Sequence, residues 1–297
     1  MKKSKFSLKK GIAYSAAALL IAFIAMRFAA KKQKDKTVYK DQPEEQNPMT
    51  GKKVIFVESE KDEVNADGKQ GHLEAVGECA YTPTFYDRFI KRGFDVIMSF
   101  VGMVALSPVY AVTSLMIKLD DPGSVIFHQK RVGKNKRYFK LSKFRSMRLD
   151  TPQNVPTHML DDPQKYVLKS GRLIRKMSID ELPQLWDIFV GNMSIIGPRP
   201  ALWNQDYLTA ERDKYGANDI KPGLTGLAQA HGRDELDIPE KAKLDGEYAV
   251  ALKKSSRSGF KMDVKVFIDS VRAVVKSDGF VEGGTGEMYK QEEKVSE

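Results

Sequence analysis

Two long apolar segments stand out in a chain that is otherwise rich in charge. The first covers residues 11–30, and its main polar interruptions are Tyr14, Ser15 and Arg27. Its length approaches the roughly 20 residues that cross a bilayer, so we expect a basic N-terminus at 1–10 followed by a membrane segment. A cleaved signal peptide is the alternative, but lysines stand where its cleavage site should lie. Because lysines flank both ends, the positive-inside rule does not orient this segment.

The second apolar segment, residues 94–119, is broken near its middle by Ser107 and Pro108. Its halves, 96–106 and 109–117, each make roughly 15 Å of helix, about half the thickness of a hydrocarbon core. Pro108 removes a backbone donor, and the Ser107 hydroxyl can satisfy a carbonyl that loses its partner. The segment is therefore a kinked spanning helix or a re-entrant helix that leaves on the side it entered, and chain physics alone favours the kinked span.

Basic residues lie on both flanks of this second segment. Such a distribution suits two ends on one, cytoplasmic, face of a membrane. The residues concerned are Arg88, Lys91 and Arg92 before it, and Lys118, Lys130 and Arg131 after it.

The remaining pattern divides the chain further. Residues 31–84 are charged and glycine-spotted, which predicts a flexible linker with one short strand-like run at 54–57. Residues 85–280 mix short strand-like and helical stretches, and the tail at 281–297 is predicted to be disordered. One late segment, 261–276, carries a helical apolar stripe. A helix of this kind packs on a core or lies in a membrane interface, and core packing is the more common case. The stripe consists of Val264, Phe267, Ile268, Val271, Val274 and Val275.

Composition narrows the class of ligand. The chain has 297 residues, 41% of them hydrophobic, and a net charge of +10. It can bury a sizeable core, and its charge predicts attraction to phosphates of nucleic acid, anionic lipid or a nucleotide sugar. Cys79 is the only cysteine, which excludes an intrachain disulfide and a cysteine-rich metal site. The four histidines show neither metal-ligand nor catalytic-triad spacing.

An adjacent carboxylate pair, Asp180 and Glu181, is the main candidate for chemistry. On a regular helix neighbouring side chains point about 100° apart, so the two either divide the work or stand where a helix begins. Capping is one explanation: Ser178 and Glu181 match a capping box, although Pro183 fits better if Asp180 is the cap. The functional explanation is that a helix N-terminus stabilises an ionised carboxylate and attracts phosphate. An ionised aspartate attacks phosphorus when cations neutralise the phosphate.

Several cations accompany this pair. Most lysines between positions 130 and 143 suit a solvated or lipid-facing basic surface, whereas arginine's planar fork suits bidentate phosphate binding. Arg199 stands between two prolines, whose restricted backbone would hold its guanidinium in place.

The motifs and their order resemble those of the bacterial sugar transferases, the monotopic phosphoglycosyl transferases, in particular the small type that primes capsule and exopolysaccharide synthesis. The resemblance covers about residues 85–278. It rests on Ser107-Pro108, Lys143-Phe144-Arg145-Ser146-Met147, Arg175 to Leu185, Gly197-Pro198-Arg199-Pro200, Lys221 to Gln229 and Gly232-Arg233-Asp234.

The resemblance implies a reaction and a set of roles. Asp180 and Glu181 would be the catalytic dyad, with Asp180 attacking the β-phosphate of a UDP-sugar, releasing UMP and forming a covalent phosphosugar intermediate. Undecaprenyl phosphate would then take the sugar phosphate, expected to be an N-acetylhexosamine phosphate. Mg²⁺ is the implied cofactor, with Asp180 as its protein ligand. The implied phosphate-binding residues are Lys143, Arg145, Arg175, Arg199 and Arg233.

The resemblance also implies a fold and a location. It favours a mixed α/β, membrane-associated domain at 85–280, with residues 94–119 as a re-entrant helix that turns at Ser107-Pro108, and with interfacial amphipathic helices. The catalytic domain would lie on the cytoplasmic face of the bacterial inner membrane. Membrane lipids are expected partners; downstream glycosyltransferases and homo-oligomers are compatible with it, and no nucleic acid is expected. The family's small members begin near the re-entrant helix, so the added N-terminal region is a departure.

A second class of function remains to be weighed: a basic, membrane-anchored scaffold that binds anionic lipid or nucleic acid through residues 130–145. It would need no Asp180, and its binding would weaken smoothly with salt. A scaffold would not release UMP from a nucleotide sugar.

Overall fold

The computed structural model describes residues 2–34, 48–62, 64–151, 163–232 and 236–276. The chain forms two units, Met1–Thr37 and Val38–Glu297. The predicted tail at 281–297 lies outside the described residues.

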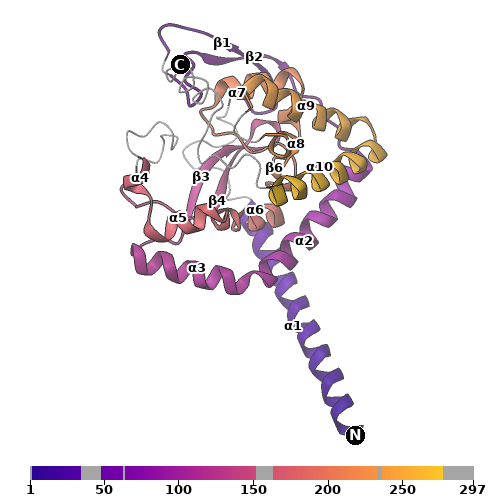
Figure 1. Cartoon of the computed structure of the whole chain (residues 1–297). Helices are drawn as coiled ribbons and strands as arrows, with labels where there is room; N and C mark the ends of the chain where they lie inside the picture. Colours follow the sequence, from indigo (N-terminus) through magenta and orange to yellow (C-terminus); the bar gives the residue numbers. More distant parts are fainter. Residues whose placement is uncertain (1, 35–47, 63, 152–162, 233–235, 277–297) are drawn as a thin grey trace. The chain divides into compact units, whose positions relative to one another are not determined.

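A single long helix, α1 (Lys2–Lys34), forms the described part of the first unit (Figure 1). It is rich in alanine, leucine and isoleucine, and Leu20, Ile21 and Phe28 expose their side chains. Within the described residues, no single helix is long and apolar enough to cross a membrane. The span predicted for residues 11–30 therefore stays a prediction.

The described residues of the second unit form three two-stranded sheets among helices (Figure 1). β1 pairs antiparallel with β2, β3 antiparallel with β4, and β5 parallel with β6. This mixture confirms the predicted α/β class. The strands are β1 (Lys52–Val57), β2 (His72–Glu78), β3 (Ile126–Val132), β4 (Tyr138–Phe144), β5 (Ser194–Ile196) and β6 (Gly223–Thr225). The helices are η2 (Tyr86–Lys91), α2 (Arg92–Ala105), α3 (Ser107–Asp120), η3 (Lys134–Lys136), α4 (Pro163–Tyr166), α5 (Lys169–Lys176), η5 (Ile179–Glu181), α6 (Gln184–Val190), α7 (Asp206–Lys214), η6 (Ala217–Asp219), α8 (Leu227–Ala230), α9 (Ile238–Lys254) and α10 (Ser256–Lys276).

The second apolar segment is two helices that meet at a bend of 60°. Pro108 has no N–H, so the carbonyl of Val104 loses its usual helical partner. The Ser107 hydroxyl replaces that partner by donating to Val104 O at 2.8 Å. The break predicted at Ser107-Pro108 is therefore confirmed. In length and composition this bent pair fits either a broken span or a re-entrant loop.

Asp95 shows why a carboxylate interrupts the apolar first half of this segment. It is 2% exposed and accepts hydrogen bonds from Ser194 Oγ at 3.0 Å and from the Ile195 N–H at 2.9 Å. These bonds fasten α2 to the start of β5, because a buried carboxylate needs partners and β5 supplies them.

Residues 52–78 were predicted to belong to a flexible linker, and that prediction is wrong. Lys52–Val57 and His72–Glu78 pair as the β1–β2 hairpin, which packs on α7. Asp213 of α7 accepts a hydrogen bond from the Val54 N–H at 2.7 Å and from Lys136 Nζ at 2.9 Å. Only 54–57 shows a strand pattern in the sequence, since β2 exposes most of its residues and carries no buried stripe.

A buried polar cluster joins the last two helices to the start of the domain. Asp263 of α10 accepts hydrogen bonds from Tyr86 Oη and Tyr248 Oη at 2.6 Å each, and from Lys91 Nζ at 2.9 Å. The paired charges and hydroxyls satisfy one another inside the core. η2, α9 and α10 are thereby fixed together.

The apolar stripe of α10 does not pack on the core, so the more common of its two expected placements is wrong. Val266 is fully buried, whereas Val264, Phe267, Ile268 and Val271 are between 41% and 57% exposed. The side chains of Val274 and Val275 lie outside the described residues. Core contact is made instead by a neighbouring face that carries Met262 and Val266. Placement of the stripe at a membrane interface stays a prediction.

One buried carboxylate, Asp187 of α6, makes stability depend on pH. It is 3% exposed, and its Oδ2 accepts the Ser142 N–H of β4 at 2.8 Å. No cationic side chain of the described residues forms an ion pair with it. Burial raises the pKa of Asp187 to about 7, although the bonds from Ser142 act in the opposite direction.

We predict that Asp187→Asn flattens the dependence of stability on pH. The folded-state pKa lies above the unfolded value, so wild-type stability should fall as pH rises from about 4 to about 7. The asparagine oxygen still accepts the Ser142 N–H, so the variant should gain a few kcal/mol over wild type at pH 8 and little at pH 4. Chemical unfolding across this range measures it, with the exposed Asp150→Asn as control. Parallel curves for Asp187→Asn and wild type would contradict the assignment.

A second interaction links α3 to the segment that follows α5. Tyr110 Oη donates to the backbone carbonyl of Leu182 at 2.5 Å, and its ring lies edge-on to Phe144 with centroids 5.4 Å apart. Ile179 and Leu182 pack against the same buried cluster. The turn at 179–181 is thereby held against the bent helix pair.

We predict that Tyr110→Phe destabilises the domain by about 1–3 kcal/mol, because the ring stays while the Leu182 carbonyl loses its donor. Equilibrium unfolding in detergent measures the loss. Tyr215→Phe is the matched control, since that hydroxyl has no hydrogen-bond partner among the described residues. Equal stability of the two variants would show that the Tyr110 bond adds nothing.

Candidate active site

The carboxylate pair lies in a strained turn and not at a helix cap. Ser178 adopts φ +54°, a left-handed conformation that is uncommon for a residue other than glycine. The short 3₁₀ turn η5 follows, and α6 begins only at Gln184. Ser178 makes no side-chain capping bond, and among the described residues the Asp180 carboxylate accepts no backbone N–H and contacts Lys143 instead. Both capping explanations are therefore wrong, and strain of this kind is often found at functional sites.

One lysine bridges the two carboxylates. Lys143 Nζ of β4 lies 3.2 Å from Glu181 Oε1 and 3.5 Å from Asp180 Oδ2. Arg199, from the Pro-Arg-Pro turn that follows β5, donates to Glu181 Oε1 at 2.6 Å. A strand, a 3₁₀ turn and a proline-bounded loop thus meet at Glu181. Two of the predicted phosphate ligands, Lys143 and Arg199, lie at the dyad.

The two carboxylates differ in their electrostatics. Burial by itself would raise the pKa of Glu181, but the charges and hydrogen bonds of Arg199 and Lys143 lower it by more than burial raises it. The pKa of Glu181 is therefore well below its usual range. For Asp180, burial and the Glu181 charge raise the pKa, and Lys143 and Arg175 only partly oppose them. Glu181 is accordingly a fixed anion between two cations. Asp180, whose contact with Lys143 is longer, is the more basic and the less engaged carboxylate.

The other predicted phosphate ligands are placed differently. Arg175 lies near enough to Asp180 to lower its pKa. Arg145 is 4% exposed and directs Nη1 to Asp121 Oδ2 at 2.5 Å and Nη2 to the Asp121 carbonyl. The structure therefore gives Arg145 a place at the end of α3 and does not bring it to the dyad, which corrects the expectation of a shared site. Arg233 lies outside the described residues.

The backbone beside Arg199 is closely packed. A Cβ atom on Gly197 would lie 2.6 Å from the Lys221 carbonyl, and one on Gly226 would lie 2.3 Å from the Gly197 carbonyl. Gly223 and Gly226 belong to the Lys221 to Gln229 motif of the sequence. In the structure these glycines allow the β5 and β6 backbones to approach each other and so place Arg199.

Sequence reasoning missed Arg131 of β3 as a site residue. It counted this arginine only among the basic flanks of the apolar segment, yet Arg131 lies close enough to Arg199 and Glu181 to feel both charges. Its partners are Pro200 and Gln129. The available signal was its register with Gln129, two positions earlier on the same face of one strand.

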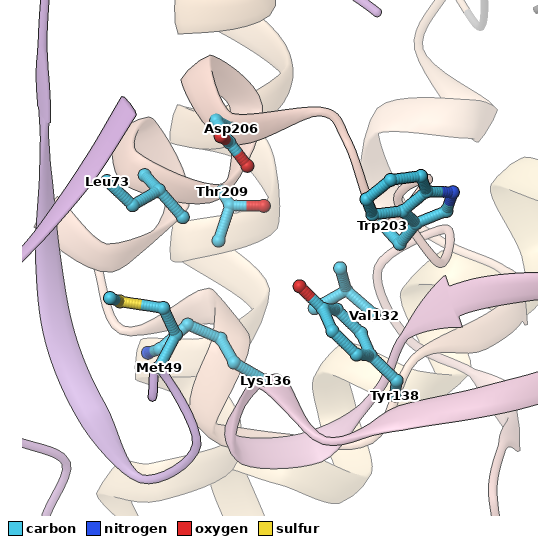
Figure 2. A pocket seen from close by; sticks show the side chains of 8 residues that line it. All are labelled: Met49, Leu73, Val132, Lys136, Tyr138, Trp203, Asp206 and Thr209. Atoms are coloured by element: carbon cyan, nitrogen blue, oxygen red, sulfur yellow. The ribbon is translucent and has the colours of Figure 1, made fainter. Parts of the chain in front are cut away.

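A separate small cavity lies among the β1–β2 hairpin, the β3–β4 hairpin and α7, as Figure 2 shows. It encloses about 10 Å³, roughly the space of one water. In Figure 2 the Asp206 carboxylate and the Tyr138 hydroxyl lie on opposite walls of this space. Burial, helped by the charge of Asp67, raises the pKa of Asp206 to about 6. No residue of the dyad lines this cavity, and it is too small for a nucleotide sugar. Its lining residues are Met49, Leu73, Val132, Lys136, Tyr138, Trp203, Asp206 and Thr209.

The carboxylates at the dyad determine whether Mg²⁺ could bind there. Among the described residues, no group of three or more histidine, cysteine or acidic side chains could hold a metal ion. Mg²⁺ usually takes one or two carboxylates and completes its shell with water and substrate phosphates. Asp180 and an incoming diphosphate fit that pattern, because Glu181 is already engaged by two cations.

Three curated relatives illustrate what the chain is similar to. Undecaprenyl-phosphate glucose phosphotransferase of Komagataeibacter xylinus is 39% identical over 55% of this chain and 32% of its own length. Exopolysaccharide production protein PSS of Rhizobium leguminosarum bv. phaseoli is 37% identical over 53% of this chain and 82% of its own length. UDP-N-acetylgalactosamine-undecaprenyl-phosphate N-acetylgalactosaminephosphotransferase of Aeromonas hydrophila is 38% identical over 54% of this chain and 38% of its own length. The matches span about a third of the first and third relatives and most of the second.

A family comparison covers more of the chain. The model of the family described as bacterial sugar transferase matches residues 86–277, which include the bent helix pair, the dyad and the Pro-Arg-Pro turn. Because that match takes in well over half of the 297 residues, the protein belongs to the bacterial sugar transferase family.

Proposed function

We propose that this protein transfers a sugar 1-phosphate from a UDP-sugar to undecaprenyl phosphate, with release of UMP, and so primes exopolysaccharide or capsule synthesis. The observation that carries the proposal is the inequality of the dyad: Glu181 is held between two cations, while Asp180 stays basic and less engaged. Family membership and the names of the relatives support the same class of reaction.

In the first step, an Asp180 carboxylate oxygen forms a bond to the β-phosphorus of the donor. The bond between that phosphorus and the bridging oxygen breaks, and UMP leaves with the electron pair. Lys143, Arg175 and Arg199 stabilise the negative charge that builds on the phosphate oxygens. In the second step, an oxygen of undecaprenyl phosphate attacks the same phosphorus and Asp180 leaves as a carboxylate.

Glu181 acts as a positioning residue in this scheme. A carboxylate whose pKa is held well below its usual range has no proton to donate near neutral pH. Its contacts orient Lys143 and Arg199 toward the place where the diphosphate would lie. We therefore assign it orientation of the two cations in preference to proton transfer.

Mg²⁺ completes the proposal as a cofactor. Asp180 would hold it together with phosphate oxygens of the donor, and the ion would supply neutralisation of the leaving group's charge.

The sugar is proposed to be an N-acetylhexosamine. The relatives' names include both glucose and N-acetylgalactosamine at nearly equal identity, so similarity alone does not choose between them. A donor panel is needed for this choice.

We further propose that α2 and α3 form a re-entrant helix pair at the inner membrane, with the active site on the cytoplasmic face. The lipid acceptor requires a membrane near the dyad, and exposed apolar side chains on α2, α3 and α10 would supply the contact. Among them are Phe94, Ile97, Val101, Val112, Leu115, Phe260 and Phe267.

We predict that Asp180→Asn lowers UMP release by about a thousandfold or more, since the amide is not a nucleophile. The assay uses detergent-solubilised full-length protein, Mg²⁺, undecaprenyl phosphate and a panel of UDP-sugars. Without the acceptor, wild type but not the variant should gain the mass of a sugar phosphate. The exposed Asp150→Asn is the control. Equal UMP release by Asp180→Asn would remove Asp180 as nucleophile and favour another catalytic group, whereas a folded wild type that releases no UMP from any donor would favour a scaffold.

We also predict that chelation of divalent cations by EDTA lowers UMP release by about a hundredfold or more and that added Mg²⁺ restores it. The reason is that the protein's own cations do not replace an ion at the leaving group. The melting temperature is followed in parallel, so loss of fold is not mistaken for loss of the ion. Full activity in EDTA would exclude a required metal.

A further inference from the structure

Arg131 is a partly buried cation whose hydrogen bonds go to neutral acceptors. Its Nη1 donates to the Pro200 carbonyl at 2.9 Å, and its Nε and Nη2 both donate to Gln129 Oε1, at 3.1 and 2.6 Å. No carboxylate of the described residues lies at ion-pair distance from it. Even a partly buried charge loses hydration, and without a counter-ion that loss is not repaid, so the position of Arg131 calls for an explanation beyond packing.

The neighbourhood of Arg131 makes this cost larger. Burial and the nearby Arg199 lower the pKa of Arg131 to about 9, while Glu181 acts in the opposite direction. The side chain remains a cation at neutral pH. Two guanidinium groups thus lie near one carboxylate, and only Arg199 bonds to it. Without a ligand the Arg131 and Arg199 guanidinium groups repel each other, and an anion that carries more than one negative charge would relieve that repulsion.

The contacts of Arg131 converge on the loop that carries Arg199. β3 pairs with this loop through the Val132 N–H, which donates to the Ala201 carbonyl at 2.9 Å, and through a bridge between Arg131 and Leu202. The guanidinium adds a bond to Pro200, the residue next to Arg199. Strand pairing fixes the loop at Ala201 and Leu202. The Arg131 side chain fixes the Pro200 carbonyl, which lies between that pairing and Arg199.

We propose that Arg131, oriented by Gln129, is a positioning residue that holds the Arg199 guanidinium at Glu181 for the donor diphosphate. This inference rests on the proposed function and deepens it. Arg131 acts through Arg199 and does not itself need to touch the substrate. Its effect should therefore vanish when Arg199 is absent, whereas a purely structural arginine would destabilise the protein in either background.

A double-mutant cycle separates these cases. Arg131→Lys keeps the charge but loses the planar fork, and we expect it to lower kcat for UMP release by about a hundredfold, with a melting temperature close to wild type. In an Arg199→Ala background the same change should lower kcat less than about threefold. Additive losses in the two backgrounds would overturn the proposal. Arg137→Lys, an exposed position on the same hairpin, is the matched control.

Two additions keep the test decisive. If Arg131→Lys does not fold, Gln129→Met takes its place in the cycle, because it removes the acceptor that orients the guanidinium and leaves the cation in place. Calorimetry with UDP repeats the cycle without turnover. We expect Arg131→Lys to weaken UDP affinity about tenfold where Arg199 is present and to leave it unchanged in the Arg199→Ala background. Should wild type bind UDP yet release no UMP from any donor, the proposed reaction fails while the binding cycle still decides the role of Arg131.

Discussion

The sharing of the Glu181 carboxylate between Lys143 and Arg199 is the contact on which the site's geometry depends. Three segments far apart in the chain meet there: a strand at 143, a 3₁₀ turn at 181 and a proline-bounded loop at 199. The Lys143 and Arg199 side chains would each sample many rotamers on their own. Their shared contact with Glu181 restricts those rotamers before a ligand binds. The fold around it can be understood as a set of supports for these three segments. Asp187 fastens α6 to β4 one residue from Lys143, and close glycine contacts between β5 and β6 place the arginine.

The bent helix pair supports the same contact from the other side. Pro108 breaks the apolar segment, Ser107 satisfies the carbonyl that the break exposes, and Tyr110 then reaches the Leu182 carbonyl just after the dyad. A straight helix through this region would carry Tyr110 away from Leu182. The bend thus places Tyr110 where its hydroxyl holds Leu182, the residue directly after the dyad. Asp95 makes the corresponding connection from α2 to β5, so both halves of the bent pair are fastened to elements that build the site.

Sequence reasoning named side chains that the structure brings together at the carboxylate pair, and it often missed the contacts that hold them. The bend at Ser107-Pro108 and the mixed α/β class follow from local rules, and the structure confirms both. Ser178 to Glu181 match a capping box in sequence, yet Ser178 is left-handed and makes no capping bond, and an α-helix begins only at Gln184. Arg145 is chemically suited to bind phosphate, but its guanidinium is bonded to Asp121. No local sequence pattern predicts a partner 24 residues away. The β1–β2 hairpin was not predicted for a similar reason, since a tertiary hydrogen bond from Val54 to Asp213 holds it in place.

The charge of the site also suggests how one dyad would serve two successive phosphates in the proposed reaction. Among the described residues, Lys143, Arg131, Arg175 and Arg199 face the carboxylates Asp180 and Glu181, which leaves an excess of positive charge. In the proposed reaction a donor diphosphate with about two negative charges would neutralise that excess. UMP would carry about two negative charges away, and the Asp180 phosphosugar would keep one where the carboxylate had one before. The excess would thus return at the moment when undecaprenyl phosphate has to bind. A site built in this way attracts each phosphate in turn without any change of conformation, because the departure of UMP restores the field that draws in the acceptor.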